Sequence, residues 1–155
     1  MKKLALHWQI LLGMVAGVLF GLLAIQFDGG EKLDAAELAC ASEMLTWWQQ
    51  QRAEHHWSCD LMIETHDTMI TADRINQFLA GTPSGTRVLW DALHTWNLGG
   101  ESPTETWNGI RDSVVHIHVK DAVPGEAMQS ARHTRPGEGK YPMAELRAIL
   151  RESDY

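Results

Sequence analysis

Three short apolar runs of the sequence contain side chains that can bind a metal ion or move a proton. These runs are residues 61–66, 87–94 and 114–120. The first contains Glu64, the second Asp91 and His94, and the third His118 and Lys120. The two carboxylates and the imidazole of His118 form a mixed oxygen and nitrogen donor set that suits Mn²⁺, Mg²⁺, Co²⁺ or Zn²⁺. A cation held there would polarise a carbonyl group and stabilise the charge formed when a proton leaves beside it.

The third run has the clearest pattern, because side chains of a strand alternate between its two faces. One face holds His116, His118 and Lys120, and the other holds Val115, Ile117 and Val119. We expect the apolar face to pack under helices and the polar face to point into the fold. Charged groups are costly in such an interior unless they bind something. Taken singly, however, Glu64, Asp91 and His118 are better explained as loop or capping residues.

Segments with helix signals separate the three runs. We expect helices at residues 34–54, 72–80, 104–111 and 142–152, and a loop rich in Gly and Pro at residues 122–141. Asp34 is the expected N-cap of the first helix, and Gly81 is expected to end the second. Alternating strands and helices predict an α/β fold with parallel βαβ units, in which the carboxyl ends of the strands form the active face.

Length and composition restrict the class of protein. The 155 residues carry a net charge of -7, which argues against a nucleic-acid partner, since phosphate binding needs a basic surface. A complete (β/α)8 barrel needs about 250 residues, so we expect a partial TIM barrel of about three βα units. Cys40 and Cys59 form no CxxC motif, and we expect both to be free, buried thiols.

The first 27 residues differ from the rest of the chain. Residues 4–27 carry no charge, Lys2 and Lys3 precede them, and acidic residues follow. Such a run is long enough to span a bilayer, with the N-terminus in the cytoplasm. We therefore expect a membrane-anchored protein with a hydrophobic, transmembrane helix at residues 1–27 and a linker at residues 28–34. A secretory signal peptide and a buried helix are the alternatives.

The residues of this segment also resemble a known family. Met1-Lys-Lys-Leu and Trp8-Gln-Ile-Leu-Leu-Gly-Met-Val-Ala-Gly-Val-Leu-Phe-Gly21 are similar to the first helix of dicarboxylate/amino acid:cation symporters. No second long apolar run follows, so transport is not expected. The resemblance instead suggests a gene fusion or a rearranged reading frame.

Four motifs of the remaining chain together resemble the sugar phosphate isomerase/epimerase family, which has xylose isomerase-like barrels. They are Ile63-Glu-Thr-His-Asp67, Leu89-Trp-Asp-Ala-Leu-His94, His116-Ile-His-Val-Lys-Asp121 and Gly137-Glu-Gly139. The resemblance covers residues 35–155, as the C-terminal part of the barrel. It implies that Glu64, Asp91 and His118 bind a divalent metal (Mn, Mg, Co or Zn), and that His94 and Lys120 face the substrate.

The resemblance also implies parts that this chain lacks. The family's fourth ligand, a glutamate on the eighth strand that acts as the base, would follow residues 150–155, and no counterpart of the first four strands is present. We therefore expect a metal-dependent isomerase/epimerase-like domain for a sugar or sugar phosphate, incomplete and inactive alone, whose open barrel edges favour self-association.

Three alternatives remain open at this point. The first is a non-enzymatic, membrane-anchored fragment produced by a fusion or truncation. The second is a hydrolase similar to apurinic endonucleases, which the acidic net charge argues against. The third is a cytoplasmic location. The isomerase resemblance implies a cytoplasmic protein, whereas residues 4–27 imply a membrane.

Overall fold

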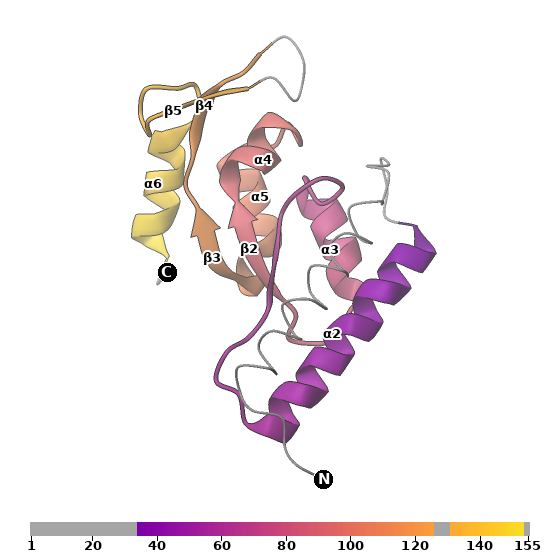
Figure 1. Cartoon of the computed structure of the whole chain (residues 1–155). Helices are drawn as coiled ribbons and strands as arrows, with labels where there is room; N and C mark the ends of the chain where they lie inside the picture. The colour runs from indigo at the N-terminus through magenta and orange to yellow at the C-terminus, as the bar shows by residue number, and fades with distance from the viewer. Residues whose placement is uncertain (1–33, 126–130, 154–155) are drawn as a thin grey trace. The chain divides into compact units, whose positions relative to one another are not determined.

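A computed structural model of the chain describes residues 34–125 and 131–153 (Figure 1). The predicted membrane helix of residues 1–27 and nearly all of the predicted linker lie outside the described residues. Among the residues that are described, no helix is both long and apolar enough to cross a membrane.

The described chain alternates helices and strands. The helices are α2 (Ala35–His55), α3 (Ala72–Ala80), α4 (Ala92–Asn97), α5 (Pro103–Ile110), the 3-10 helix η1 (Arg111–Ser113) and α6 (Met143–Glu152). The strands are β1 (Met62–Glu64), β2 (Arg87–Asp91), β3 (Val114–His118), β4 (Asp121–Val123) and β5 (Arg132–Thr134). The helix expected from residue 34 is confirmed, because Asp34 and Glu37 form a capping box at its start.

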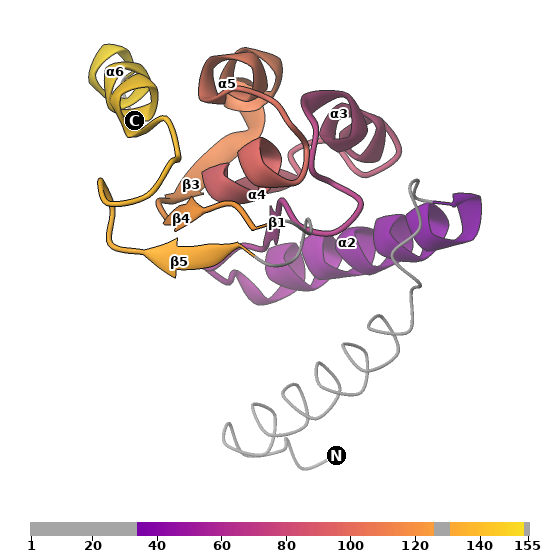
Figure 2. The ribbon, with the colours of Figure 1, turned by 90° about the horizontal axis from the view of Figure 1, so that it is seen from above.

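Strands β1, β2 and β3 form one parallel sheet in that order. Helices α3, α5 and α6 lie in a row along one face of this sheet, as Figure 2 shows. The prediction of an α/β fold with the parallel strands of a partial barrel is confirmed at this level. Because all three strands run the same way, their carboxyl ends meet at one edge of the sheet and bring the polar residues of the sequence motifs together.

Strand β2 ends earlier than the sequence suggested. A strand was expected to reach His94, but β2 stops at Asp91 and α4 begins at the next residue. The Asp91 side chain accepts hydrogen bonds from the backbone N–H groups of Leu93 and His94, so it acts as the N-cap of α4. The early turn into a helix fixes His94 one helical turn beyond Asp91, beside the strand ends.

The expectation for the faces of β3 is only partly correct. Val88 pairs with Val114 and Leu89 pairs with His116, so Val115 is an extra residue at a β-bulge. Val115 is therefore exposed, and Val119, which lies beyond the end of the strand, is exposed as well. Only Ile117 of the three predicted apolar residues is buried. Because of the bulge, His116 and His118 lie on the same side of the sheet as Leu89 and Asp91.

The segment expected to be a loop contains a short hairpin. Strands β4 and β5 pair antiparallel, with Ala122 opposite His133. The following helix, α6, has Pro142 as its N-cap and begins at Met143, close to the predicted start. The hairpin brings His133 back over the strand ends.

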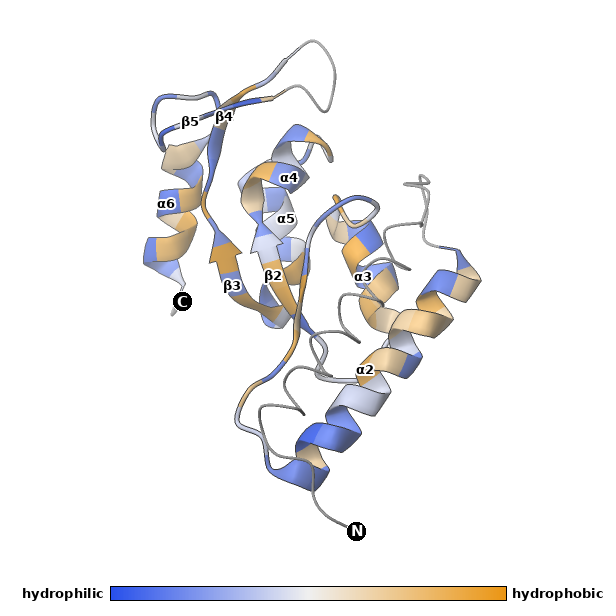
Figure 3. Ribbon diagram, viewed as in Figure 1, coloured by the Kyte–Doolittle hydropathy of each residue, from blue (hydrophilic) through white to orange (hydrophobic). Residues whose placement is uncertain are grey.

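A single apolar core lies between the sheet and the row of helices. Its central residues are Ile75, Val88, Trp90, Leu93, Ile110, Tyr141 and Leu146. Trp90 is fully buried, and its indole N–H donates a hydrogen bond of 2.9 Å to Thr95 Oγ1 in α4. Figure 3 shows the apolar character of β2 and β3 and the polar surface of the C-terminal half of α2. The cysteine expectation was wrong in part, since Cys40 and Cys59 are free but exposed.

Candidate metal centre

Asp91 lies at the centre of the polar cluster at the strand ends. Its side chain is fully buried, and Oδ1 accepts the N–H groups of Leu93 at 3.1 Å and His94 at 3.3 Å. Oδ2 is in direct ion-pair contact with Lys120 Nζ, and it also lies 3.7 Å from His118 Nδ1 and 3.8 Å from His94 Nδ1. Asp91 thus has one oxygen committed to the helix and one directed at the Lys120 ammonium group and two imidazoles.

Glu64 and His118 approach Asp91 from the two neighbouring strands. Asp91 pairs with His118 in the β2–β3 register, and Glu64 pairs with Leu89 in the β1–β2 register. His118 Nδ1 lies 3.1 Å from Glu64 Oε1, so the strands on both sides of β2 meet at this point. The three predicted metal ligands are therefore adjacent.

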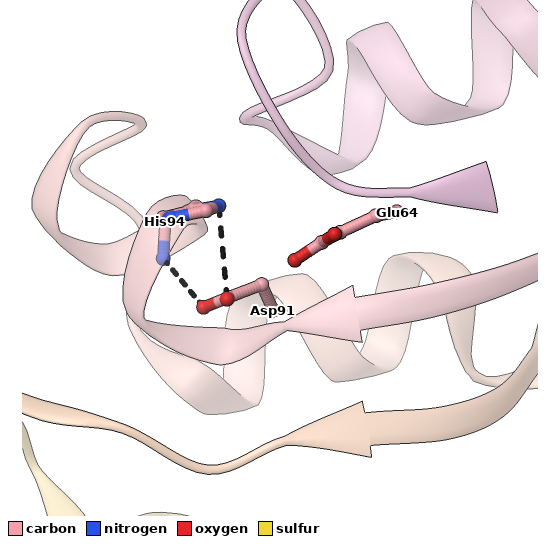
Figure 4. Close-up of side chains that lie close together, drawn as sticks. All are labelled: Glu64, Asp91 and His94. Carbon is pink, nitrogen blue, oxygen red and sulfur yellow. Dashed lines mark hydrogen bonds and ion pairs between the residues drawn. The ribbon is translucent and has the colours of Figure 1, made fainter. Parts of the chain in front are cut away.

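The sequence predicted that His94 faces the substrate. In the structure, His94 lies close to the two carboxylates. Glu64, Asp91 and His94 each offer one ligand atom, and these atoms lie within 4.8 Å of one another. Figure 4 shows the Glu64 carboxylate directed toward Asp91, whose own carboxylate lies beside His94 at the start of α4. His94 Nδ1 is 2.9 Å from the carbonyl oxygen of Thr65, which can only accept a hydrogen bond. In the tautomer with its proton on Nδ1, His94 donates to this carbonyl and Nε2 is left with a lone pair.

Thr65 is a residue of the site that sequence reasoning missed. It is buried, and its Oγ1 accepts the backbone N–H of Asp91 at 2.8 Å. Its own backbone N–H donates to the carbonyl oxygen of Leu89 at 3.0 Å, and its carbonyl oxygen orients His94. Thr65 thus joins the ends of β1 and β2. Its place inside the motif of residues 63–67 was the available signal, but a hydroxyl that bonds to backbone has no distinct sequence pattern.

Lys120 lies against the carboxylate that was expected to bind metal. It follows the end of β3, and its ammonium group forms an ion pair with Asp91 Oδ2. The ammonium group compensates the buried negative charge of Asp91, as a metal ion in its place would. A metal ion binding to Oδ2 must therefore compete with Lys120.

Asp121 organises the chain beyond the cluster. Oδ1 accepts the N–H groups of Ala122 and Tyr141, and Oδ2 accepts those of Gly137 and Gly139, all within 3.1 Å. Burial raises the pKa of the Asp121 carboxyl, but the four backbone hydrogen bonds outweigh it and leave the pKa below its ordinary value.

The motif Gly137-Glu-Gly139 has a structural role at this carboxylate. Gly137 has a φ of 94°, which favours glycine, and a Cβ at Gly139 would lie 2.1 Å from Asp121 Oδ1. Both glycines therefore let the backbone approach Asp121 closely. The loop that they form holds the segment directly after Lys120.

The residues present fit a divalent cation. Glu64, Asp91 and His94 offer ligand atoms within 4.8 Å of one another, and His118 Nδ1 lies 3.1 Å from Glu64 Oε1 and 3.7 Å from Asp91 Oδ2. Hard oxygen donors with imidazole nitrogen suit Mn²⁺, Mg²⁺, Co²⁺ and Zn²⁺ alike. The donor set alone does not discriminate among these metals.

The architecture is that of part of a barrel, with candidate ligands at the carboxyl ends of its parallel strands. The family model described as xylose isomerase-like TIM barrel matches residues 34–155, and the chain belongs to this family. No curated protein matches the chain significantly in sequence. The comparisons give no support to the resemblance of residues 1–27 to symporters.

Two solved structures share the fold. One is the probable 3-DHS dehydratase AsbF of Bacillus anthracis, involved in petrobactin synthesis, with a TM-score of 0.61 and 18% identity over 77% of this chain and 47% of that one. The other is a xylose isomerase domain protein from Planctomyces limnophilus, with a TM-score of 0.59 and 21% identity over 78% of this chain and 43% of that one. The chain thus spans less than half the length of either structure.

Proposed function

We propose that the chain binds a divalent metal at the strand ends and uses it to hold a sugar or sugar phosphate for proton transfer beside a carbonyl group. The observation that carries this proposal is the cluster of Glu64, Asp91 and His94, whose ligand atoms lie within 4.8 Å of one another around the fully buried Asp91. An ionised carboxylate in that position is costly unless a cation compensates it. Family membership and the fold shared with a dehydratase and a xylose isomerase domain protein support a small-molecule ligand.

Each residue of the cluster has a proposed role. Glu64, Asp91 and His118 bind the metal, and His94 directs Nε2 toward the substrate or supplies a further donor. The metal would act as a Lewis acid on a substrate oxygen. Lys120, which neutralises Asp91 without a metal, would become available to a substrate oxygen once the metal takes its place.

The base for the proton transfer is not assigned to any described residue. The family resemblance assigns it to a glutamate on a further strand of the barrel. Metal binding and turnover are therefore separate questions, and each needs its own measurement.

Calorimetry of the full chain with Mn²⁺ tests the metal site. We expect micromolar binding that weakens at least tenfold in Asp91→Asn, because Asn keeps the Oδ1 acceptor that caps α4 but loses the charge. Asp112→Asn is the matched control, since its side chain is almost fully exposed at the opposite end of β3. His118→Ala and His94→Ala then rank the two imidazoles, and we expect the larger loss for His118.

A folded chain that binds neither Mn²⁺ nor Zn²⁺ would contradict the proposal and favour a non-enzymatic protein. Circular dichroism of each variant separates lost binding from lost folding. Turnover of aldoses and ketoses is measured afterwards, on protein loaded with the metal that binds most tightly.

A further inference from the structure

The two outer strands of the parallel sheet are more exposed than the central strand. Within the described residues, β1 and β3 each pair only with β2. Met62 in β1 is 44% exposed and Val115 in β3 is 45% exposed, whereas Val88 and Trp90 in β2 are buried. The outer edges of β1 and β3 therefore offer backbone donors and acceptors with which another strand can pair.

The metal centre is exposed on the same two flanks. The Asp91 side chain, from the central strand, is fully buried, but those of Glu64 and His118, from the outer strands, are 39% and 37% exposed. His116 is also exposed, and its ring meets that of His118 edge-on with centroids 5.6 Å apart. Among the described residues, no strand beyond β3 supplies a carboxylate to this side of the cluster.

The carboxyl ends of the outer strands carry complementary groups. Strand β1 ends in the carboxylate of Glu64, while β3 ends in His118 and Lys120 follows it. Opposite charges on neighbouring strands stabilise their pairing, and like charges destabilise it. A parallel pairing of β3 with β1 from another copy would bring these unlike ends together. Parallel pairing of identical edges would bring like ends together, and antiparallel pairing would separate the ends.

Each strand of the sheet contributes one side chain to the cluster, in the order Glu64, Asp91 and His118. A fourth parallel strand that ends in a carboxylate would therefore extend the cluster by one ligand beyond His118. Strand β1 of a second copy has that ending. All three strands of the sheet already pair in parallel, so this addition continues the existing hydrogen-bond pattern.

We propose that copies of the chain associate head to tail, with β1 of a second copy added in parallel to the outer edge of β3, and that Glu64 of the second copy becomes a ligand of the metal centre of the first. The contact is heterologous, because the two copies use different surfaces. The assignment of the shared ligand rests on the proposed function, whereas the pairing of the strands does not.

Metal binding and association should strengthen each other in such an assembly. The second carboxylate is present only in the assembled form, so Mn²⁺ binds that form more tightly and shifts the equilibrium toward it. The second carboxylate also offsets the charge of Lys120, which competes with the metal for Asp91.

Two edge variants test the pairing by sedimentation velocity. Met62→Lys places a charge on the β1 edge and Val115→Lys places one on the β3 edge, and each charge would be buried by pairing at that edge. Neither variant should associate alone. An equimolar mixture should form a 1:1 complex, since each chain retains the edge that the other has lost.

Association of either variant alone would indicate pairing between identical edges and would overturn the proposal. A mixture that stays monomeric would overturn it as well. Because Met62 and Val115 are both nearly half exposed, the substitutions should leave the fold intact, which circular dichroism checks. Met62→Glu and Val115→Glu repeat the experiment with the opposite charge, and Trp47→Lys, a change on α2, should associate as the unmodified chain does.

A second measurement asks whether Glu64 acts on the neighbouring copy. Met62→Lys is titrated with Mn²⁺ by calorimetry, alone and with an excess of a Val115→Lys chain that also carries Asp91→Asn to weaken its own site. The added chain should raise the Mn²⁺ affinity at least fivefold. It should no longer do so when it also carries Glu64→Gln, whereas Glu138→Gln in its place is the matched control and should preserve the gain.

An Mn²⁺ affinity that the added chain leaves unchanged would overturn the shared ligand while leaving the metal centre of a single copy intact. A gain that survives Glu64→Gln would overturn it too. Absence of Mn²⁺ binding in every sample would be a failure of the proposed function and of the shared ligand with it. The sedimentation experiment would still decide whether β3 pairs with β1.

Discussion

Asp91 shows how a single residue can combine a structural and a chemical role. One oxygen caps α4, and the other faces the Lys120 ammonium group in a buried position. The capping role explains why the residue must directly follow a strand. The chemical role depends on which cation compensates Oδ2, and Lys120 and a metal ion are competitors for that place.

The competition gives a prediction for Lys120→Met. Removing the ammonium group should raise Mn²⁺ affinity roughly tenfold, because a positive charge next to the metal is lost while an apolar stem of similar length is kept. Calorimetry at constant ionic strength measures the change. Lys140→Met serves as the control, since Lys140 is exposed and makes no described ion pair with Asp91.

A fall in Mn²⁺ affinity in Lys120→Met would contradict this account. It would mean that Lys120 positions Asp91 for the metal instead of competing with it. A loss of sugar binding in the same variant is compatible with either outcome, because Lys120 is also proposed to contact the substrate.

At the scale of elements, Asp121 connects β4 to the loop of residues 137–141 through four backbone hydrogen bonds. Its pKa is lower in the folded protein than in the unfolded chain. The stabilisation is therefore fully present above the unfolded value of about 3.9 and is lost as the pH falls through the folded value. Replacing the carboxylate should remove this acid-sensitive contribution.

Asp121→Asn should lower the free energy of unfolding by about 1–3 kcal/mol at pH 7, since an amide offers one acceptor oxygen in place of two. The difference from the unmodified protein should shrink as the pH falls below about 3.9. Urea unfolding followed by fluorescence at pH 7 and at several acidic pH values measures it. Glu138→Gln, an exposed change on the same loop, should have little effect at any pH.

The elements also show how far sequence reasoning reaches. The start of α2 after Asp34 was predictable because a capping residue acts locally, and α5 begins at Pro103, one residue before the expected start at residue 104. The end of β2 at Asp91 was not predictable, because Asp91 continues an apolar run and stops the strand only through its bond to the next turn. The bulge at Val115 depends on the register with β2, which no single strand encodes.

In the site, too, some features could be predicted from the sequence and others could not. Glu64, Asp91 and His118 could be placed together from strand ends alone, since parallel strands share an edge. The contribution of Thr65 could not be predicted, because it acts through backbone hydrogen bonds. Lys120 and His133 depend on how the chain turns after β3, which is set by tertiary contacts such as those of Asp121.

At the scale of the whole molecule, the open sheet is the feature that most favours self-association. Within the described residues, β1 and β3 are the outer strands of the sheet and each pairs only with β2. Unpaired strand edges offer backbone groups to another copy of the chain. Met62, in the outer strand β1, is 44% exposed and adds apolar surface at that edge.

We therefore predict concentration-dependent self-association of the full chain that Met62→Lys reduces. A charged residue on an edge strand disfavours pairing with another edge, because the charge would be buried in the new interface. Sedimentation velocity at two protein concentrations measures the change in the distribution of species. Trp47→Lys is the contrasting variant, since Trp47 is 56% exposed and belongs to α2, not to a strand of the sheet. A shift to smaller species in Trp47→Lys alone would assign the association to α2, and no shift in either variant would show that neither surface drives it.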